Sequence, residues 1–268
     1  MGSRQTELNT LLQFAHTLAE ASAKAIAPHF RTQLGVHNKG GHAFDPVTRA
    51  DRAAERAMRK EIRSRFPEHS VLGEEYGAID GAARYRWVID PIDGTRAFIT
   101  GSPLWGTLIG LLEGDRPVLG LMNQPFTRER FWSDGRRPWR RGPQGREQRL
   151  RTRPCASLAT AVLTTTHPDL FATEAEAAAF GAIKARARMT RYGGDCYSYC
   201  LLAAGFIDII IEAGLKPYDV VALVPIIESA GGIITTWRGA SAVNGGRIIA
   251  AGDARVHREA MALLRGAP

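Results

Sequence analysis

The sequence predicts an α/β fold of the α+β type, in which helices pack against two β-sheets. In the first half, the apolar runs at residues 105–112 and 117–124 are joined by a short polar turn, a pattern typical of an antiparallel hairpin. In the second half, strand-like and helix-like segments alternate, which favours a more mixed sheet. Hydrophobic residues make up 44% of the 268 residues, enough for a large core or for two closely packed halves.

Two amphipathic helices are expected before the first sheet. Apolar residues recur at helical spacing over residues 6–31 and again over residues 49–66. Between them, residues 35–46 are rich in glycine and predict a mobile loop. Its histidines, His37 and His42, are read as solvated side chains in preference to parts of a gate over a binding site.

The hairpin is expected to continue into a third strand around residues 131–132, and Pro225 should kink a later helix or mark its first turn. The other expected strands are residues 161–164, 189–191, 207–212, 232–236 and 247–251. The other expected helices are residues 174–185, 195–204, 219–230 and 254–265.

The rest of the chain is organised around residues 87–95, which read WVIDPIDGT. The apolar run predicts a buried strand that stops at Pro91. Asp90 and Asp93 then lie at the mouth of a buried strand, where carboxylates are costly unless something pairs them. Mg²⁺ pairs well with carboxylate and phosphate oxygens, so this is a candidate metal–phosphate site. On its own, an aspartate-capped turn explains the pattern equally well.

Three further acidic residues favour the metal interpretation, because each lies beside an apolar run. Asp51 falls in the first turn of the 49–66 helix, Glu74 follows a short apolar pair, and Asp219 opens a helix of the second half. Simpler explanations exist: Asp51 and Asp219 suit helix N-termini, and Glu75 reads as a solvated neighbour of Glu74. If acids from both halves converge, the site lies in a cleft between them.

The chain carries a net charge of +8, and arginines crowd residues 136–153. In order of preference, this Arg-rich segment is a solvated basic surface, a rim that attracts phosphate, or a nucleic-acid-binding surface. Nucleic acid is the least favoured partner because Trp139 is the one aromatic residue among these arginines. Three cysteines, no signal peptide and no long apolar run predict a cytoplasmic protein without membrane contact.

Four segments, in this order, resemble the inositol monophosphatase family of Mg²⁺-dependent, lithium-sensitive phosphatases: residues 45–51, 72–77, 87–95 and 214–219. Three segments are similar to its histidinol-phosphatase branch: residues 95–107, 192–197 and 212–219. The resemblance implies a layered αβαβα sandwich and a homodimer. It also implies an N-terminal subdomain (1–150) with an antiparallel sheet and most metal ligands, and a C-terminal subdomain (151–268) that completes the cleft.

The resemblance further implies the ligands of the metal site. Asp90, Asp93 and Asp219 would hold one Mg²⁺. Glu74, Asp90 and the main-chain carbonyl of Ile92 would hold a second, and a third ion near Glu74 is a feature of the family.

The resemblance also assigns catalytic roles. Thr95 and Asp51, with Glu74 in the same group, would orient a water molecule activated by the metal and take its proton. The backbone amides of Gly94 and Thr95 would hold the phosphoryl oxygens. The two aspartates of the central stretch are three residues apart with a proline between them, the wrong register for an aspartyl-phosphate route, so no covalent intermediate is expected.

Substrate choice is assigned to residues expected to touch or brace the leaving group, which are Asp195, Glu212 and Arg191. Glu212 precedes Asp219 by seven residues, the spacing at which the family places a substrate-contacting glutamate. Two acids facing the leaving group suit a cationic alcohol. The resemblance to the histidinol-phosphatase branch implies such a substrate, L-histidinol phosphate. Helix capping by Asp195 is an equally favoured reading, and Arg191 either braces the site or touches substrate.

Two alternatives stay open. Inositol 1-phosphate, or another small phosphate ester, is the alternative substrate within the same family. The alternative of a different class is a nucleic-acid-binding module that uses the Arg-rich segment and whose metal site is only structural. That module would bind with a steep salt dependence.

Overall fold

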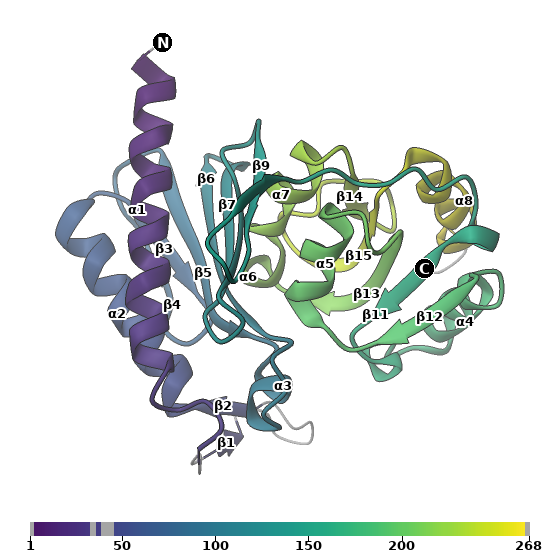
Figure 1. Ribbon diagram of the computed structural model, residues 1–268, viewed down its shortest axis with the longest axis horizontal. Helices are drawn as coiled ribbons and strands as arrows, with labels where there is room; N and C mark the ends of the chain where they lie inside the picture. The colour runs from purple at the N-terminus through teal and green to yellow at the C-terminus, as the bar shows by residue number, and fades with distance from the viewer. Residues whose placement is uncertain (1–2, 33–35, 39–45, 266–268) are drawn as a thin grey trace.

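The computed structural model describes residues 3–32, 36–38 and 46–265, and two β-sheets dominate this part of the chain (Figure 1). The first sheet has eight strands in the order β10-β9-β8-β7-β6-β5-β3-β4. The second has five strands in the order β12-β11-β13-β15-β14, and β1 and β2 form a separate two-stranded ribbon. No helix of the described residues is long and apolar enough to cross a membrane.

The strands of the ribbon and first sheet are β1 (Val36–Asn38), β2 (Pro46–Thr48), β3 (Ser70–Gly73), β4 (Gly77–Ile79), β5 (Tyr85–Asp93), β6 (Gly106–Glu113), β7 (Arg116–Gln124), β8 (Glu129–Ser133), β9 (Pro138–Arg141) and β10 (Glu147–Arg149). Those of the second sheet are β11 (Val162–Thr165), β12 (Met189–Tyr192), β13 (Ile209–Leu215), β14 (Ile233–Thr236) and β15 (Gly246–Ala251). The α-helices are α1 (Ser3–Ile26), α2 (Arg49–Arg65), α3 (Thr95–Ile99), α4 (Glu174–Lys184), α5 (Asp195–Ala203), α6 (Pro217–Val220), α7 (Leu223–Ser229) and α8 (Ala254–Leu264).

Helices form three layers around the two main sheets (Figure 1). α1 and α2 pack against each other and against strands of the first sheet, on its outer face. α5 and α7 lie between the sheets, where each contacts strands of both, and α6 packs on β5. α4 and α8 pack together outside the second sheet, where α8 contacts β15. The predicted layered αβαβα sandwich is therefore confirmed.

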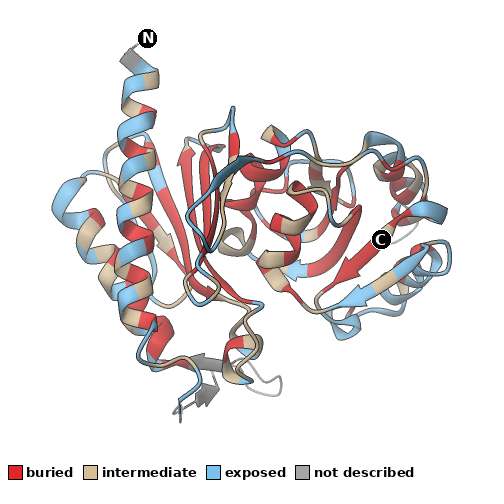
Figure 2. Ribbon diagram, in the orientation of Figure 1, coloured by how far each residue is buried: buried red, intermediate tan, exposed pale blue. Residues whose placement is uncertain are grey.

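The hydrophobic core runs through these layers, and Figure 2 shows buried residues on the strands and on the helix faces that meet them. One cluster joins Leu108 and Met122 of the first sheet to Leu223 and Ile226 of α7 and to Ile248 of the second sheet. Because protein interiors are packed as densely as organic crystals, such a shared core fixes the position of one sheet relative to the other. Residues that the two halves contribute to one site are held at a defined separation.

The two N-terminal helices form where their apolar spacing predicts, with one correction. α2 has its expected apolar stripe buried and begins at a capping box in which Thr48 is the N-cap residue. α1 ends at Ile26, not at residue 31, and a turn follows. Pro28 explains the earlier end, because proline lacks an N–H group and disfavours helical backbone in the residue before it.

The central strand was predicted to stop at Pro91, and this is wrong. β5 continues through Pro91 to Asp93 and pairs with β6 on both sides of it. The pairing register shifts between Asp90 and Asp93, so proline lies at an irregularity where its missing N–H group breaks no regular ladder. The irregular end of this buried strand carries Asp90 and Asp93 of the candidate site.

The first sheet also differs from a wholly antiparallel one, because β3 pairs with β5 in parallel. The predicted hairpin is β6–β7, and the predicted third strand is β8. The loop expected at residues 35–46 is wrong for 36–38 and for residue 46, since β1 pairs with β2 there. The rest of that expected loop, including His42, lies outside the described residues.

The Arg-rich segment forms the hairpin β9–β10, and several of its arginines have partners within the protein. Arg140 pairs with Glu129 at 2.8 Å, and Arg153 pairs with the buried carboxylate of Asp208 at 2.6 Å. Arg149 lies over the ring of Trp139, 5.1 Å from its centroid. A segment that uses its charges in this way is structural in part, which weakens the nucleic-acid alternative.

The second half follows the predicted alternation. Its sheet is mixed: β12, β11 and β13 run parallel, whereas β13, β15 and β14 run antiparallel. The single helix expected at residues 219–230 is instead two, α6 and α7. Pro225 lies in the first turn of α7, one of the two positions predicted for it.

Candidate metal centre and active site

Three aspartates from the two halves of the chain meet at one point. Asp90 and Asp93 come from the irregular end of β5, and Asp219 comes from the short helix α6. One carboxylate oxygen from each lies within 4.8 Å of the corresponding oxygens of the other two. The structure thus brings together the three acids that the family resemblance assigns to one metal ion.

Each carboxylate is held by a backbone N–H group. Asp90 Oδ1 accepts a hydrogen bond from the amide of Ile92 at 2.9 Å, and Asp219 Oδ2 accepts one from Lys216 at 2.7 Å. Asp93 Oδ2 accepts one from the amide of Cys196 at 2.6 Å, across 103 residues of sequence. The predicted helix-stabilising role of Asp219 is real, because its carboxylate accepts the backbone amide of Lys216, the N-cap residue of α6. The same side chain also belongs to the acidic cluster.

Burial and mutual repulsion raise the pKa of all three carboxyl groups. For Asp90 and Asp93 burial is the main cause, followed by neighbouring acids that include Glu74 for Asp90 and Asp195 for Asp93. Burial raises the pKa of Asp219 to about 7, and Glu74 adds to the effect. A divalent cation would offset this repulsion, and a cluster of oxygen donors alone suits Mg²⁺. The donor set therefore fits the ion that the resemblance implies.

This repulsion has an expected consequence for the metal-free protein. The pKa of Asp219 is about 7 in the folded protein and near 4 in an unfolded chain, so folding takes up a proton between these values and loses stability as pH rises. In the presence of chelator, the melting temperature of Asp219→Asn relative to that of the wild type should therefore rise by roughly 5 °C between a pH of about 5 and a pH of about 7.5.

The wild type is compared with the variant at each pH because buried histidines titrate in the same pH range and change the stability in the opposite direction. Burial lowers the pKa of His16 to about 4, which makes stability rise with pH, and this contribution is common to both proteins. Thermal unfolding at the two pH values gives the measurement. A difference in melting temperature between the two proteins that does not grow between the two pH values would contradict the prediction.

Asp51 lies in the first turn of α2, and its two carboxylate oxygens have different surroundings. Oδ2 accepts hydrogen bonds from the Thr48 amide at 2.8 Å and from the Thr48 hydroxyl at 2.5 Å, completing the capping box. Oδ1 is buried and has no hydrogen-bond partner among the described residues. Burial raises the pKa of Asp51 to about 6, with a smaller contribution from Glu74. A buried carboxylate with one free oxygen and a pKa near neutrality is suited to accepting a proton.

Glu74 lies in the turn between β3 and β4, next to this cluster. Its charge raises the pKa of Asp51, Asp90 and Asp219, which places it in the same electrostatic group. The neighbouring Glu75 was read as solvated, and this is wrong: its side chain is 1% exposed and lies 4.0 Å from Arg52. Its burial depends on α2, which a local pattern around residues 72–77 does not include.

Gly94 and Thr95 connect β5 to α3 at the edge of the acidic cluster. Gly94 adopts φ of +87°, a left-handed conformation that glycine tolerates without strain. The Thr95 hydroxyl donates a hydrogen bond to the carbonyl of Ile92 at 3.1 Å. The first N–H groups of a helix have no acceptor within the helix, so the amides here are suited to holding phosphoryl oxygens.

A cavity of about 550 Å³ opens beside this cluster. The predicted site residues that line it are Asp93, Gly94, Thr95, Asp195, Glu212 and Asp219. The sequence reasoning missed Arg96, His167 and Cys196, which line it too. Of these, Arg96 alone had a local signal, since it directly follows the motif that ends at Thr95.

Asp195 and Glu212 place two more acids in the cavity. Glu212 is 3% exposed and accepts hydrogen bonds from the Thr166 amide at 2.9 Å and the Tyr199 hydroxyl at 2.8 Å. Burial raises the pKa of Glu212. Burial, and then the charge of Glu212, raise the pKa of Asp195 to about 7, while Arg96 opposes the shift.

The structure does not support helix capping as the role of Asp195, because Gly194 is the N-cap residue of α5. Asp195 instead has a left-handed φ of 41° and packs against Gly94, where an added Cβ would lie 3.1 Å from its Cγ. Arg191 is exposed on β12 and is not among the described residues that line the cavity. Its expected role at the site is therefore not supported.

Residues 7–267 match the family model described as the inositol monophosphatase family. The protein named bifunctional phosphatase IMPL2, chloroplastic, of Arabidopsis thaliana is 44% identical, over 96% of this chain and 75% of that protein. The histidinol-phosphatase of Streptomyces coelicolor is 32% identical, over 94% of this chain and 96% of that one. The structure of an inositol monophosphatase from Zymomonas mobilis aligns with a TM-score of 0.84 and 40% identity, over 99% of this chain and 100% of that one. Sequence, fold and acidic cluster agree, and the chain belongs to the inositol monophosphatase family.

Proposed function

We propose that the protein is a Mg²⁺-dependent phosphomonoesterase that hydrolyses L-histidinol phosphate to L-histidinol and phosphate, a step of histidine biosynthesis. The observation that carries the choice of substrate is the pair of acids, Asp195 and Glu212, in the cavity beside the three clustered aspartates. L-Histidinol phosphate carries an ammonium group and an imidazole, both suited to acidic partners. Three relatives named histidinol-phosphatase, 32–34% identical to this chain, support the same choice.

The metal-binding residues in this proposal are Asp90, Asp93 and Asp219, with Glu74 and the carbonyl of Ile92 around a second ion. When bound, Mg²⁺ lowers the pKa of a water molecule and neutralises charge on the phosphoryl group. Two or three ions are proposed per site. Every one of these donors is oxygen, as Mg²⁺ prefers.

The protein's own groups position the attacking water and the phosphoryl group, and they take the proton of the water. The free Oδ1 of Asp51 accepts the proton of the attacking water, and the Thr95 hydroxyl orients that water. The amides of Gly94 and Thr95 hold the phosphoryl oxygens in line with the attack. No side chain forms a covalent bond to phosphorus in this scheme, so the phosphoryl group passes directly to water.

Asp195 and Glu212 hold the leaving alcohol. Without a cation the pKa of each is raised, so a bound ammonium or imidazolium would stabilise their ionised forms and gain binding energy in return. Tyr199 and the Thr166 amide fix the Glu212 carboxylate, which still has lone pairs to accept further hydrogen bonds. A neutral polyol gains less from two acids, which makes inositol 1-phosphate the weaker candidate.

The test is phosphate release from L-histidinol phosphate, inositol 1-phosphate, fructose 1,6-bisphosphate and adenosine 3′,5′-bisphosphate, each with Mg²⁺ and with chelator. We expect a Mg²⁺-dependent rate on L-histidinol phosphate well above the others. Preference for inositol 1-phosphate would keep the metal chemistry and overturn the substrate. The proposal includes a homodimer, which light scattering in solution would test.

Replacing the two cavity acids should change substrate preference. Asp195→Asn and Glu212→Gln should each lower kcat/KM for L-histidinol phosphate roughly 10- to 100-fold, since a hydrogen bond to a charged group contributes about 1.5–3 kcal/mol. The loss for inositol 1-phosphate should be much smaller. Asp169→Asn is the matched control. Asp169 is an exposed acid two residues after the lining residue His167, and it does not itself line the cavity. Equal losses on both substrates would contradict the assigned role.

A further inference from the structure

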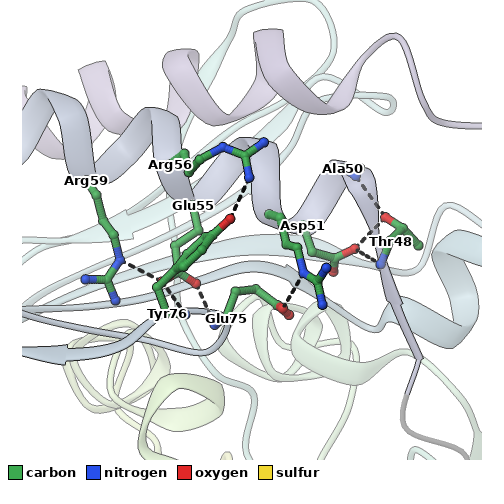
Figure 3. A network of polar contacts seen from close by, with 9 residues as sticks. Thr48, Ala50, Asp51, Glu55, Arg56, Arg59, Glu75 and Tyr76 are labelled. Atoms are coloured by element: carbon green, nitrogen blue, oxygen red, sulfur yellow. Dashed lines mark hydrogen bonds and ion pairs between the residues drawn. The ribbon is translucent and has the colours of Figure 1, made fainter. Parts of the chain in front are cut away.

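Glu55 is a buried carboxylate on α2 that does not line the cavity, yet its hydrogen bonds go to the turn that carries Glu74 (Figure 3). Its side chain is 0% exposed. It accepts hydrogen bonds from the backbone amides of Glu75 at 2.7 Å and Tyr76 at 3.1 Å, and from Arg59 Nε at 2.7 Å. One anion therefore receives two consecutive amides of the turn and one arginine.

The turn fits closely around this ion pair. A Cβ atom at Gly73 would lie 2.2 Å from Oε1 of Glu55, so the absence of a side chain at Gly73 lets the carboxylate lie against the backbone. Arg59 also donates a hydrogen bond to the carbonyl of Gly77. Glu55 and Arg59 thus contact the turn at its beginning, middle and end.

Two contacts at the rim extend the same attachment (Figure 3). Arg52 lies 4.0 Å from the carboxylate of Glu75, and Arg56 donates a hydrogen bond to the hydroxyl of Tyr76 at 2.5 Å. Asp51 lies four residues before Glu55, on the same face of α2. A single helix therefore carries both the proposed proton acceptor and the groups that hold the Glu74 turn.

Stability alone does not explain a charge at this position. Taking a carboxylate and a guanidinium out of water is costly, and apolar side chains of similar volume often stabilise a protein equally well or better. An apolar side chain, however, accepts no hydrogen bond from the two amides. What the anion adds is a defined backbone geometry at residues 75 and 76, directly after Glu74.

We propose that Glu55, together with Arg59, is a positioning residue that fixes the turn and so aims the Glu74 carboxylate at the metal centre. This inference rests on the proposed function in one respect, since it takes Glu74 as a metal ligand. Groups that orient metal ligands commonly change metal affinity 10- to 100-fold when they are replaced, without contacting the ion.

The test is Mg²⁺ binding to the intact protein by isothermal titration calorimetry, with no substrate present. Glu55→Gln should weaken Mg²⁺ binding roughly 10- to 100-fold. The NH₂ group of glutamine cannot accept a hydrogen bond, so at least one N–H donor that now bonds to Glu55 would lose its acceptor. Arg59→Lys is a milder second variant that keeps the charge but loses the bond to Gly77, and a smaller loss is expected. In turnover assays, raising Mg²⁺ should restore the kcat of Glu55→Gln toward that of the wild type.

Asp208→Asn is the matched control. Asp208 is also buried, and it accepts hydrogen bonds from Arg153 at 2.7 and 2.6 Å and from the Val162 amide at 2.7 Å, but it does not line the cavity. It should lose thermal stability and keep its Mg²⁺ affinity. Wild-type Mg²⁺ affinity in folded Glu55→Gln or Arg59→Lys, or equal losses in Asp208→Asn, would overturn the inference.

The calorimetric readout separates the two claims. If the wild type binds Mg²⁺ but does not hydrolyse L-histidinol phosphate, the substrate proposal fails, and the variants still test the role of Glu55. If the wild type binds no Mg²⁺, Glu74 is not a metal ligand and the positioning role is overturned as well.

Discussion

Replacing Asp90 with Asn should lower kcat/KM for phosphate release at least about a thousandfold and abolish tight Mg²⁺ binding. Asp90 is 1% exposed and lies among acids that raise its pKa, so its charge is tolerable mainly when a cation is present. A metal ion contributes several kcal/mol to such reactions, and each 1.4 kcal/mol corresponds to a tenfold change in rate. Steady-state kinetics over a range of Mg²⁺ concentrations give the measurement.

The same substitution should have the opposite effect on the stability of the metal-free protein. Asparagine keeps a side-chain oxygen for the Ile92 amide and removes one of the repelling charges. Asp90→Asn should therefore melt at a higher temperature than the wild type in chelator and gain less from added Mg²⁺. Asp208→Asn, which changes an equally buried aspartate elsewhere, should retain activity. Mg²⁺-dependent release by Asp90→Asn within about tenfold of the wild type would rule out the assigned ligand role.

Replacing Asp51 with Asn should lower kcat about a hundredfold or more, the range in which a positioned general base contributes. The amide group in place of the free Oδ1 would no longer accept a proton. The side-chain oxygen in place of Oδ2 would still accept the hydrogen bond from the Thr48 amide and preserve the start of α2. Mg²⁺ affinity and KM should change little. A large loss of Mg²⁺ affinity together with kcat would show that Asp51 acts in holding the metal, contrary to the proposal.

Thr48→Ala tests the same base without removing it. The Thr48 hydroxyl donates to Asp51, and this bond lowers the pKa of Asp51 against the larger effect of burial. Its loss should raise that pKa, so the acidic limb of the pH–rate profile should move to higher pH. Loss of the cap should also destabilise the protein by about 1 kcal/mol. An acidic limb that stays in place while stability falls would separate Asp51 from the proton transfer.

Much of the fold follows from local pattern. The apolar stripe of α2, the hairpin β6–β7 and the alternation of the second half are properties of residues a few positions apart, and the structure has them where they were expected. The aspartates of the central stretch stood out in the same way, as two acids after an apolar run, although the local pattern alone fits an aspartate-capped turn equally well. The structure then shows Asp219 beside them.

Other features depend on contacts between segments far apart in the sequence. Glu75 was read as solvated and Glu55 drew no prediction, yet each is buried by the packing of α2 against the turn before β4. Asp195 reads equally well as a helix cap or as a substrate contact, and only the structure shows it in the cavity, packed against Gly94 of the other half. Arg191 follows a plausible site pattern and is nevertheless exposed on β12.

The two kinds of feature differ in the forces that decide them. Hydrophobic periodicity, prolines and helix caps act within about four residues, so the amino-acid sequence alone predicted most of the helices and strands, and the family resemblance implied their layered arrangement and the metal role of the acids. The burial and partners of a charged side chain depend on which distant backbone reaches it, as at Asp93 and Cys196. The cost of an unpaired charge in the core selects those partners, and only the packed tertiary structure determines them.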